Sequence, residues 1–293
     1  MAVLTAERIS SLAVALLTRT LVLPRTVSMI PGSEFSGGNG DTITVRVRQP
    51  REARTQSAPN ELLIADEADE VPVQVSMAHL YNLHNLTDQE ATFELADFGL
   101  QVTLPQVRAV AIGAENAVAT AMNNLDPDIV LDADGTDIED SLIEASERLD
   151  EADVPADERY CAVSPRVASL VMGIDTFVRV DASGSDQLLR QAVIGKLYNF
   201  TFVKTNGLTR GHAVAYHSSG FAFATRPPVN PRGATDSAVV NEQGIALRQV
   251  FQYDATRAKD QSLVSTFAGA SAVYDDDSGL DNRRFVKLEV ESS

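Results

Sequence analysis

The sequence predicts an α+β fold, and three patterns carry that prediction. Apolar and polar residues alternate over several short segments, most cleanly at 42–48, where the letters are TITVRVR. An apolar stripe with helical spacing runs from Pro105 to about Leu125. A polar and acidic stretch of more than twenty residues separates the strand at 42–48 from the next one at 73–83. Strands joined in this way do not form a compact hairpin, and loops this long inside a domain are usually functional or disordered.

The composition narrows the class of protein. Hydrophobic residues make up 44% of the 293 residues, which is enough for a sizeable buried core. No apolar run of about eighteen residues occurs, so we expect no membrane span, and the N-terminus lacks the pattern of a signal peptide. The single cysteine, Cys161, excludes an internal disulfide framework, and its apolar neighbours predict a buried thiol. The formal charge of −17 argues against duplex binding through a basic surface.

The N-terminal residues predict an arm. Residues 5–20 are expected to form a helix that Thr5 caps. Its apolar face holds Ile9, Leu12, Ala13, Leu16 and Leu17. Residues 31–40, with the letters PGSEFSGGNG, then form a flexible link. A helix followed by such a link indicates an arm that packs on something beyond its own domain, although an ordinary core helix has the same pattern.

The long loop between the first two strands is bipolar in charge. At 42–48, Ile43, Val45 and Val47 share one face, and at 73–83 the apolar side consists of Val73, Val75, Met77, Tyr81 and Leu83. One limb carries Arg46, Arg48, Arg51 and Arg54, and the other carries Glu61, Asp66, Glu67, Asp69 and Glu70. A bipolar projection can pair with the same element of a neighbouring copy, so we predict that these nine residues make contacts between subunits. The charge pattern alone favours the alternative, a solvated loop.

The middle of the chain is expected to be mostly helical. Thr87 and Glu90 form a capping box for a helix over 87–100. Pro105 then begins the longer helix, whose apolar stripe consists of Val107, Val110, Ala111, Ala114, Val118, Ala121, Met122 and Leu125. A loop follows at 126–137. Asp137 is expected to cap a helix over 138–149, whose inward side consists of Ile138, Leu142, Ala145 and Leu149.

Short strands dominate the rest of the chain. After a strand at 159–163, Ser164 and Pro165 open a short helix that Gly173 ends, and another short helix is expected at 186–193. A strand at 197–204 leads into Asn206-Gly207, a strong hairpin signal. The remaining strands are expected at 212–216, 221–225, 245–253, 262–273 and 285–290.

No constellation of residues indicates catalysis. His79 and His84 are five apart, as are His212 and His217, and this spacing does not suit a metal site. The acidic loop at 126–137 fails the calcium-binding pattern, because counting back from Gly135 puts Val130 first and Ser141 twelfth. A looser oxygen-ligand site in that loop is left open. No phosphate-binding or nucleophile motif occurs, so we predict a protein that is not an enzyme and has no cofactor and no metal.

Several stretches together resemble a known family. The stretch at 159–173, RYCAVSPRVASLVMG, resembles a strand of that family followed by a short helix that Pro begins and Gly ends. IGKLYNFTFVKTNGLTRGHAVAYHSSGFAFATRPP resembles its next passage, and the opening LTRTLVLPRTVSMIPGSEFSGGNGDTITVRVRQP resembles its branch without a covalent cross-link. VPVQVSMAHLYNLHNLTDQEATFELADF resembles the return of that branch's loop. The family is that of the tailed-bacteriophage major capsid (coat) proteins, with the Hong Kong ninety-seven-like fold, and the resemblance spans most of the chain.

The resemblance implies an organisation and a role. Residues 1–40 would form an N-terminal arm and 41–86 an extended loop. Residues 87–136 and 234–293 would form a peripheral domain with a long spine helix, and 137–233 an axial domain. The protein would assemble with itself into pentamers and hexamers of an icosahedral head that encloses double-stranded DNA.

Partners and location follow from the same resemblance. We expect a separate scaffolding protein, since no long helical segment precedes the arm, as well as a portal. Whether a decoration protein also binds the shell is left open. Assembly is expected in the host cytoplasm, with the product in the virion. Residues 41–86 contain no lysine, so a lysine cross-link is not expected, and the chain is too short for a large inserted domain. The alternatives are a non-capsid oligomeric α+β binding protein and, third, an enzyme.

Overall fold

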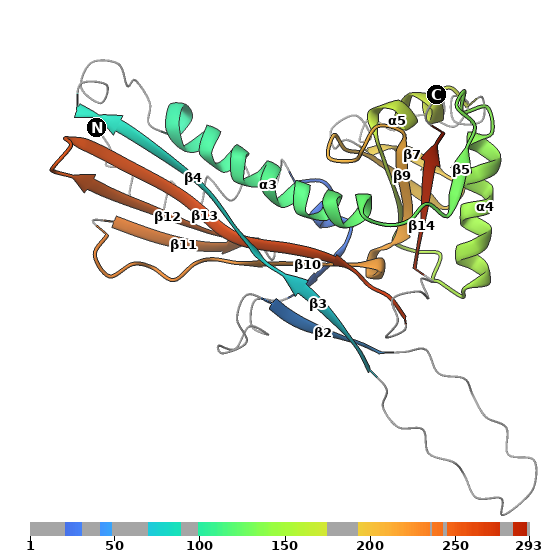
Figure 1. The fold of residues 1–293 in the computed structure, drawn as a ribbon, viewed down its shortest axis with the longest axis horizontal. Helices are drawn as coiled ribbons and strands as arrows, with labels where there is room; N and C mark the ends of the chain where they lie inside the picture. The colour runs from blue at the N-terminus through green and yellow to red at the C-terminus, as the bar shows by residue number, and fades with distance from the viewer. Residues whose placement is uncertain are drawn as a thin grey trace, which may run out of the picture.

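The computed structural model describes residues 21–30, 42–48, 70–88, 99–174, 193–234, 236–242, 245–275 and 284–291. Within these ranges the chain forms two six-stranded sheets, a two-stranded ribbon and the helices α3, α4 and α5 (Figure 1). The predicted helix at 5–20, the link at 31–40, the part of the 87–100 helix at 89–98 and the part of the 186–193 helix at 186–192 lie outside these ranges. Val193 itself is the first residue of a strand. Thr87 is the last residue of a strand, and Asp88 directly after it is helical.

The first sheet, called the long sheet below, has the order β1-β10-β13-β12-β11, with β4 on the other edge of β13. Its strands are β1 (Ser28–Ile30), β10 (Phe221–Arg226), β13 (Lys259–Ala272), β12 (Ile245–Asp254), β11 (Asp236–Glu242) and β4 (Ala78–Thr87). Only β1 pairs in parallel, with β10, and the other described pairs in this sheet are antiparallel. The predicted strands at 221–225, 245–253 and 262–273 are thereby confirmed, whereas β1 and β11 were not predicted.

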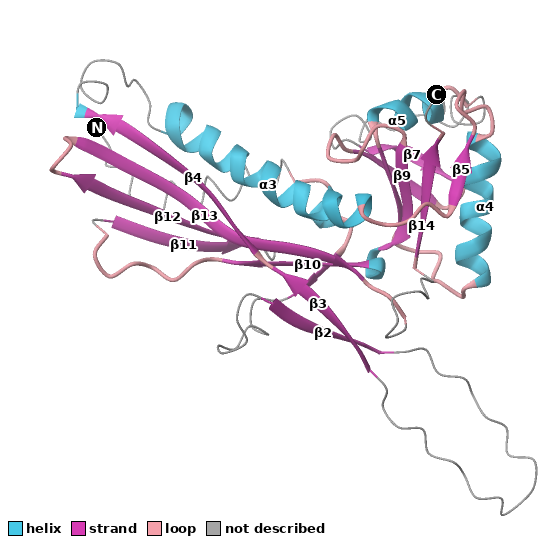
Figure 2. Cartoon of the chain, in the orientation of Figure 1, coloured by secondary structure: helices cyan, strands magenta, loops and turns pink. Residues whose placement is uncertain are grey.

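Helix α3 (Leu104–Asn123) lies along one face of the long sheet (Figure 2). Its buried side chains are Gln106, Val107, Val110, Ala111, Ala114, Val118, Ala119 and Met122, which confirms the predicted helix and most of its stripe. Leu80 of β4 lies against the helix, 3.1 Å from where a Cβ on Gly113 would be. Because many residues of the stripe are small, the helix axis lies close to the sheet.

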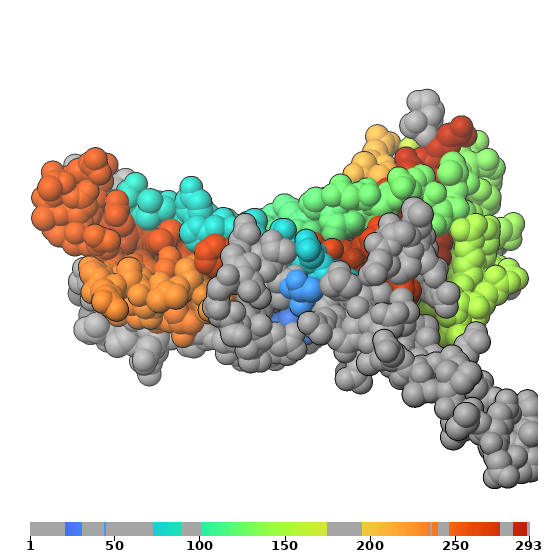
Figure 3. All heavy atoms as spheres, turned by 60° about the horizontal axis from the view of Figure 1, so that its bottom comes forward, coloured from blue at the N-terminus to red at the C-terminus, as the bar shows by residue number. Residues whose placement is uncertain are grey.

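The second sheet, called the end sheet, has the order β5-β14-β9-β6-β8-β7. Its strands are β5 (Ile129–Leu131), β14 (Phe285–Val290), β9 (His212–His217), β6 (Arg159–Val163), β8 (Phe200–Lys204) and β7 (Val193–Leu197). Helices α4 (Ile138–Glu151) and α5 (Pro165–Met172) share a buried cluster with one face of it. Strand β9 is buried on both faces: Ala213 and Ala215 face that cluster, while Val214 and Tyr216 face the cluster around α3. Figure 3 shows the resulting elongated molecule.

One predicted strand proves to be a hairpin. The segment 197–204 was predicted as a single strand, but β7 and β8 are antiparallel neighbours that join at Tyr198 and Asn199. Both residues have positive φ, 48° and 66°, as a type I′ turn requires. The sequence did not reveal the turn, because Tyr stands at its first position, where a glycine would have indicated one.

The predicted hairpin at Asn206-Gly207 is wrong. Strand β6 lies between β8 and β9, so the segment after β8 crosses over β6 and does not turn directly back. Gly207 has a different role, since a Cβ there would lie 2.7 Å from the Cβ of Ala119 on α3. The glycine therefore permits close packing on the helix.

Candidate functional site

The ribbon of β2 (Thr42–Arg48) and β3 (Glu70–Ser76) is a two-stranded sheet separate from the two larger ones (Figure 1). The two strands are antiparallel, and their register pairs Ile43 with Val75, Val45 with Val73 and Val47 with Val71. This confirms the predicted strand at 42–48. The single strand predicted at 73–83 is divided at Met77 between β3 of the ribbon and β4 of the long sheet. Two strands alone are marginally stable in water, so a ribbon of this kind needs a further surface to pack on.

The base of the ribbon is anchored on the long sheet. Val73 and Val75 are buried at 7% and 0% exposure. Their cluster also holds Ile30, Ala222, Ala224 and Val273. Gly269 of β13 lies where the chain passes from β3 to β4, and a Cβ there would be 2.2 Å from the carbonyl oxygen of Ser76. The ribbon therefore leaves the body at a point that packing fixes.

Three of the nine charged residues predicted to make contacts between subunits lie on this ribbon. Arg46 and Arg48 are in β2 and Glu70 is in β3. The register places Arg48 opposite Glu70 of the same chain, and Arg46 opposite Pro72. The other six, Arg51, Arg54, Glu61, Asp66, Glu67 and Asp69, lie outside the described residues. The intersubunit role of all nine stays a prediction.

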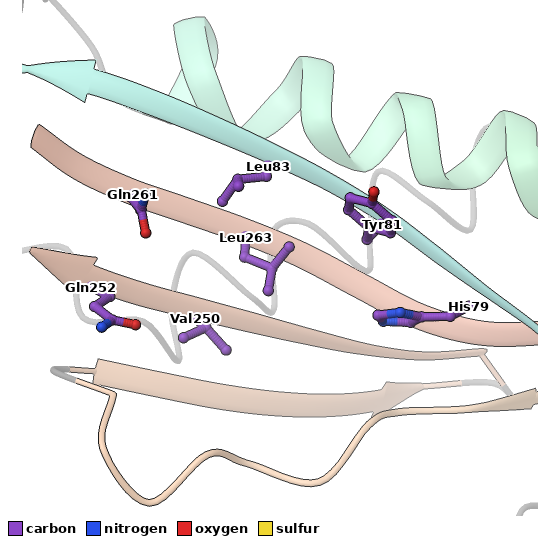
Figure 4. A pocket seen from close by; sticks show the side chains of 7 residues that line it. All are labelled: His79, Tyr81, Leu83, Val250, Gln252, Gln261 and Leu263. Carbon is purple, nitrogen blue, oxygen red and sulfur yellow. The ribbon is translucent and has the colours of Figure 1, made fainter. Parts of the chain in front are cut away.

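A second exposed feature is the face of the long sheet that points away from α3. Since Leu80 faces the helix, the alternating neighbours His79, Tyr81 and Leu83 point to the opposite side. There they line a hollow of about 330 Å³ (Figure 4). Its other lining residues are Val250, Gln252, Gln261 and Leu263. We call these seven residues the open face.

The open face has exposed apolar side chains among uncharged polar ones. Tyr81 and Leu83 have relative exposures of 64% and 47%. The ring of His79 lies between those of Phe267 and Tyr81, at centroid distances of 4.8 Å and 5.5 Å. Among the described residues that line the hollow there is no acid, lysine or arginine. The sequence put Tyr81 and Leu83 on one side with Val73 and Val75, yet only the last two are covered by the described residues.

The third feature is the arm root, residues 21–27, where the predicted arm joins the body. Its short helix η1 (Leu23–Arg25) packs against α3, and Leu21 and Leu23 are buried. The hydroxyl of Thr26 donates to the carbonyl oxygen of Leu23 and lies 2.5 Å from the phenol oxygen of Tyr216. The Glu115 carboxylate of α3 accepts hydrogen bonds from the backbone N–H groups of Val22 and Leu23.

The acidic loop at 126–137 is held by its own structure. Both oxygens of Asp137 accept from the backbone N–H of Asp132 at 3.1 Å, so its side chain does not make the predicted cap of α4. Asp128 accepts from the backbone N–H of Lys287 at 2.8 Å. Among the described residues no three His, Cys, Asp or Glu side chains gather as a metal would require.

The histidine and cysteine side chains have structural surroundings. Burial lowers the pKa of His212, whose Nε2 lies 3.5 Å from Glu289, and burial also lowers the pKa of His217, which accepts from the N–H of Ser219. Cys161 is buried, as predicted, and burial raises the pKa of its thiol. None of the helices that the structure describes is long and apolar enough to cross a membrane.

Comparisons with known proteins give a match in structure alone. No family model and no curated protein sequence matches the chain. A protein of Mycobacterium phage Che8 has a TM-score of 0.60 at 18% identity, with 92% of this chain and 90% of that one covered. The capsid of the Cyanophage P-SCSP1u gives 0.62 at 12%, covering 93% and 89%. The virus-like particle from Pyrococcus furiosus gives 0.57 at 10%, covering 97% and 98%.

These matches settle the fold. The chain has the α+β fold of tailed-phage capsid proteins, the Hong Kong ninety-seven-like fold, and the predicted fold class is confirmed. At such low identity the match concerns the arrangement of strands and helices, and the role of individual residues has to be argued from this chain itself.

Proposed function

We propose that the chain is a major capsid protein, which assembles with itself into the pentamers and hexamers of an icosahedral phage head enclosing double-stranded DNA. The observation that carries this proposal is the extent of the structural match, which includes 93% of the chain and 89% of a cyanophage capsid protein. A match over a fragment would support a shared domain only. A match over nearly the whole length supports a shared architecture, and that architecture builds shells in the proteins compared.

The exposed features of the subunit support the same role. The open face presents apolar surface, at Tyr81 and Leu83, that the described part of the chain leaves uncovered. The arm and the loop at 41–86 would lie over neighbouring copies and cover such surface on assembly. Burial contributes about 25 cal/mol for each Å² of apolar surface removed from water, so association would be driven mainly by this term. Charged contacts of the loop would set register more than affinity.

The two sheets support a division into domains. We infer that residues 137–233 form the axial domain and that 87–136 with 234–293 form the peripheral domain, with 1–40 as arm and 41–86 as extended loop. Strands β5 and β14 complete the end sheet and β10 belongs to the long sheet. The chain thus crosses between the two bodies several times, which favours domains that move little relative to each other.

Partners belong to the proposal as well. A separate scaffolding protein, a portal and a decoration protein would act with the shell, assembly would occur in the host cytoplasm, and the product would be part of the virion. The shell would hold DNA without sequence-specific contacts, consistent with a formal charge of −17. We infer no enzymatic activity, and without lysine at 41–86 no lysine cross-link in that loop.

Electron microscopy and sedimentation of the purified chain test the proposal. We expect closed shells, or sheets and tubes when no scaffolding protein is present. Small discrete oligomers would contradict it and favour a non-capsid oligomeric binding protein. Turnover of a substrate that disappears on changing one His or Asp would favour an enzyme. Nuclease treatment of particles from an infected host then tests whether the shell protects DNA.

A further inference from the structure

The arm root begins with backbone groups that need a partner. Helix η1 starts at Leu23, and the first N–H groups of a helical turn have no acceptor within the turn. No side chain of the root caps them. Because Leu21 and Leu23 are 2% and 0% exposed, water does not readily reach this segment. An acceptor must therefore come from elsewhere in the fold.

Glu115 of α3 supplies that acceptor. Its Oε2 lies 3.0 Å from the N of Val22 and 3.1 Å from the N of Leu23, and its Oε1 lies 3.3 Å from the latter. The hydroxyl of Thr205, in the segment after β8, donates to Oε1 at 3.2 Å. One carboxylate thus joins three segments: the arm root, the middle of α3 and the connection from the end sheet.

The carboxylate at this position carries a cost as well as a benefit. No lysine or arginine of the described chain lies within ion-pair distance of Glu115, and its burial raises the pKa of the carboxyl group. On β9 the phenol of Tyr216 faces Glu115, and this phenol is hydrogen-bonded to the hydroxyl of Thr26. A buried carboxylate without a cation is costly, and the hydrogen bonds that it accepts from the N–H groups of Val22 and Leu23 offset part of that cost. What the carboxylate adds is direction, since two N–H groups aimed at one acceptor fix the orientation of two successive peptide planes.

We propose that Glu115 is a positioning residue for assembly: it fixes the direction in which the residues before Leu21 leave the subunit, and so the angle at which one copy meets the next. The inference rests on the proposed function, because an arm direction matters only if the arm reaches a neighbour. Its basis is the geometry of the three-segment junction. Loss of the carboxylate frees the root while the apolar contacts of Leu21 and Leu23 keep it near α3.

The test compares Glu115→Ala and Glu115→Gln with the wild-type chain. Glu147→Ala is the matched control, because that carboxylate is exposed on α4. Hydrogen exchange at the Val22 and Leu23 amides is measured on the unassembled subunit, and particle diameters are measured by electron microscopy. We expect roughly tenfold faster exchange at both amides in Glu115→Ala, with a shifted or broadened distribution of diameters. Glu115→Gln keeps one acceptor oxygen and should show a smaller change in the same direction.

Two results would overturn the inference. One is a Glu115→Ala shell with the wild-type distribution of diameters, and the other is unchanged exchange at the two amides. If Glu115→Ala does not fold, Glu115→Gln decides, and wild-type behaviour in both measurements would reject the proposal. Failure of the wild-type chain to form any shell or sheet is a separate outcome, since it refutes the proposed function itself.

Discussion

Lys287 shows how a single buried charge can join the two sheets. The side chain is 3% exposed, and its ammonium group donates to the carbonyl oxygens of Asn123 at 3.0 Å and Leu125 at 2.6 Å. These carbonyls end α3 and have no partner within the helix. The positive charge also suits the negative end of the helix dipole. A lysine of β14 in the end sheet thus secures the end of the helix that covers the long sheet.

Replacing Lys287 by Met should destabilise the subunit by about 3 kcal/mol, because two buried carbonyl oxygens lose their donor. Chemical denaturation of the unassembled subunit measures this free energy. Lys196→Met is the control, since Lys196 is exposed, and we expect it to change the free energy of unfolding by less than about 0.5 kcal/mol. Equal stability of the two variants would contradict the assigned role.

His212 predicts a pH dependence of stability. Burial and the nearby Lys287 lower its pKa, so the folded chain binds a proton there less readily than the unfolded chain does. Stability is therefore lost as the pH falls through the ordinary histidine range near about 6.5. The free energy of unfolding should decrease between pH 7.5 and 5.5 more in the wild type than in His212→Gln. Parallel pH profiles of the two proteins would contradict this prediction.

Among the elements, the crossing from β3 to β4 depends on one glycine. Gly269→Ala would put a Cβ 2.2 Å from the carbonyl oxygen of Ser76, so the backbone of one strand must move. We expect a loss of about 1–3 kcal/mol, as for overpacking of a core, although Ala in place of Gly normally favours a strand. Gly233→Ala is the control, because no atom lies within 4 Å of its Cβ position. Thermal unfolding of both variants measures the difference.

The elements also show how far the sequence alone reaches. The stripe from Pro105 predicted α3 because twenty residues give several turns of consistent spacing. Strand β5 has three residues, too few to show a period. The β7–β8 turn uses Tyr198 where Gly would have signalled it. Asn206-Gly207 signalled a hairpin falsely, because its Gly serves packing on α3.

The candidate site was predictable to a similar extent. Alternation at 42–48 and 73–83 predicted the ribbon, and the length of the loop between them indicated a projection. The open face was not predicted, because the exposure of Tyr81 and Leu83 depends on which face of the long sheet α3 covers. That choice depends on contacts between segments far apart in the chain. Glu115 was missed for the same reason, since its partners Val22 and Thr205 are distant in sequence.

At the scale of the whole molecule, we expect changes at the open face to impair assembly and leave the folding of the subunit intact. Tyr81→Ser with Leu83→Ser removes exposed apolar surface and little of the core, since both side chains point away from α3. We expect the subunit to stay folded, by circular dichroism, and the yield of particles to fall at least about tenfold. Ile143→Ser on α4 is the control, because that side chain is also exposed, at 44%. Full particle yield from the double variant would show that neighbours do not use this face.

Charge reversal in the loop tests whether ion pairs between subunits set the register of neighbouring copies. Reversal to Glu at Arg46 and Arg48 should reduce particle yield, because like charges would then face each other. The ribbon offers a sharper comparison, since Arg48 lies opposite Glu70 of its own chain. If this pair acts within one ribbon, Arg48→Glu and Glu70→Arg should restore assembly only when both changes are in the same chain. If it acts between subunits, mixing the two single variants should restore assembly as well. Normal yield from the Arg46 and Arg48 reversal alone would remove these arginines from the interface.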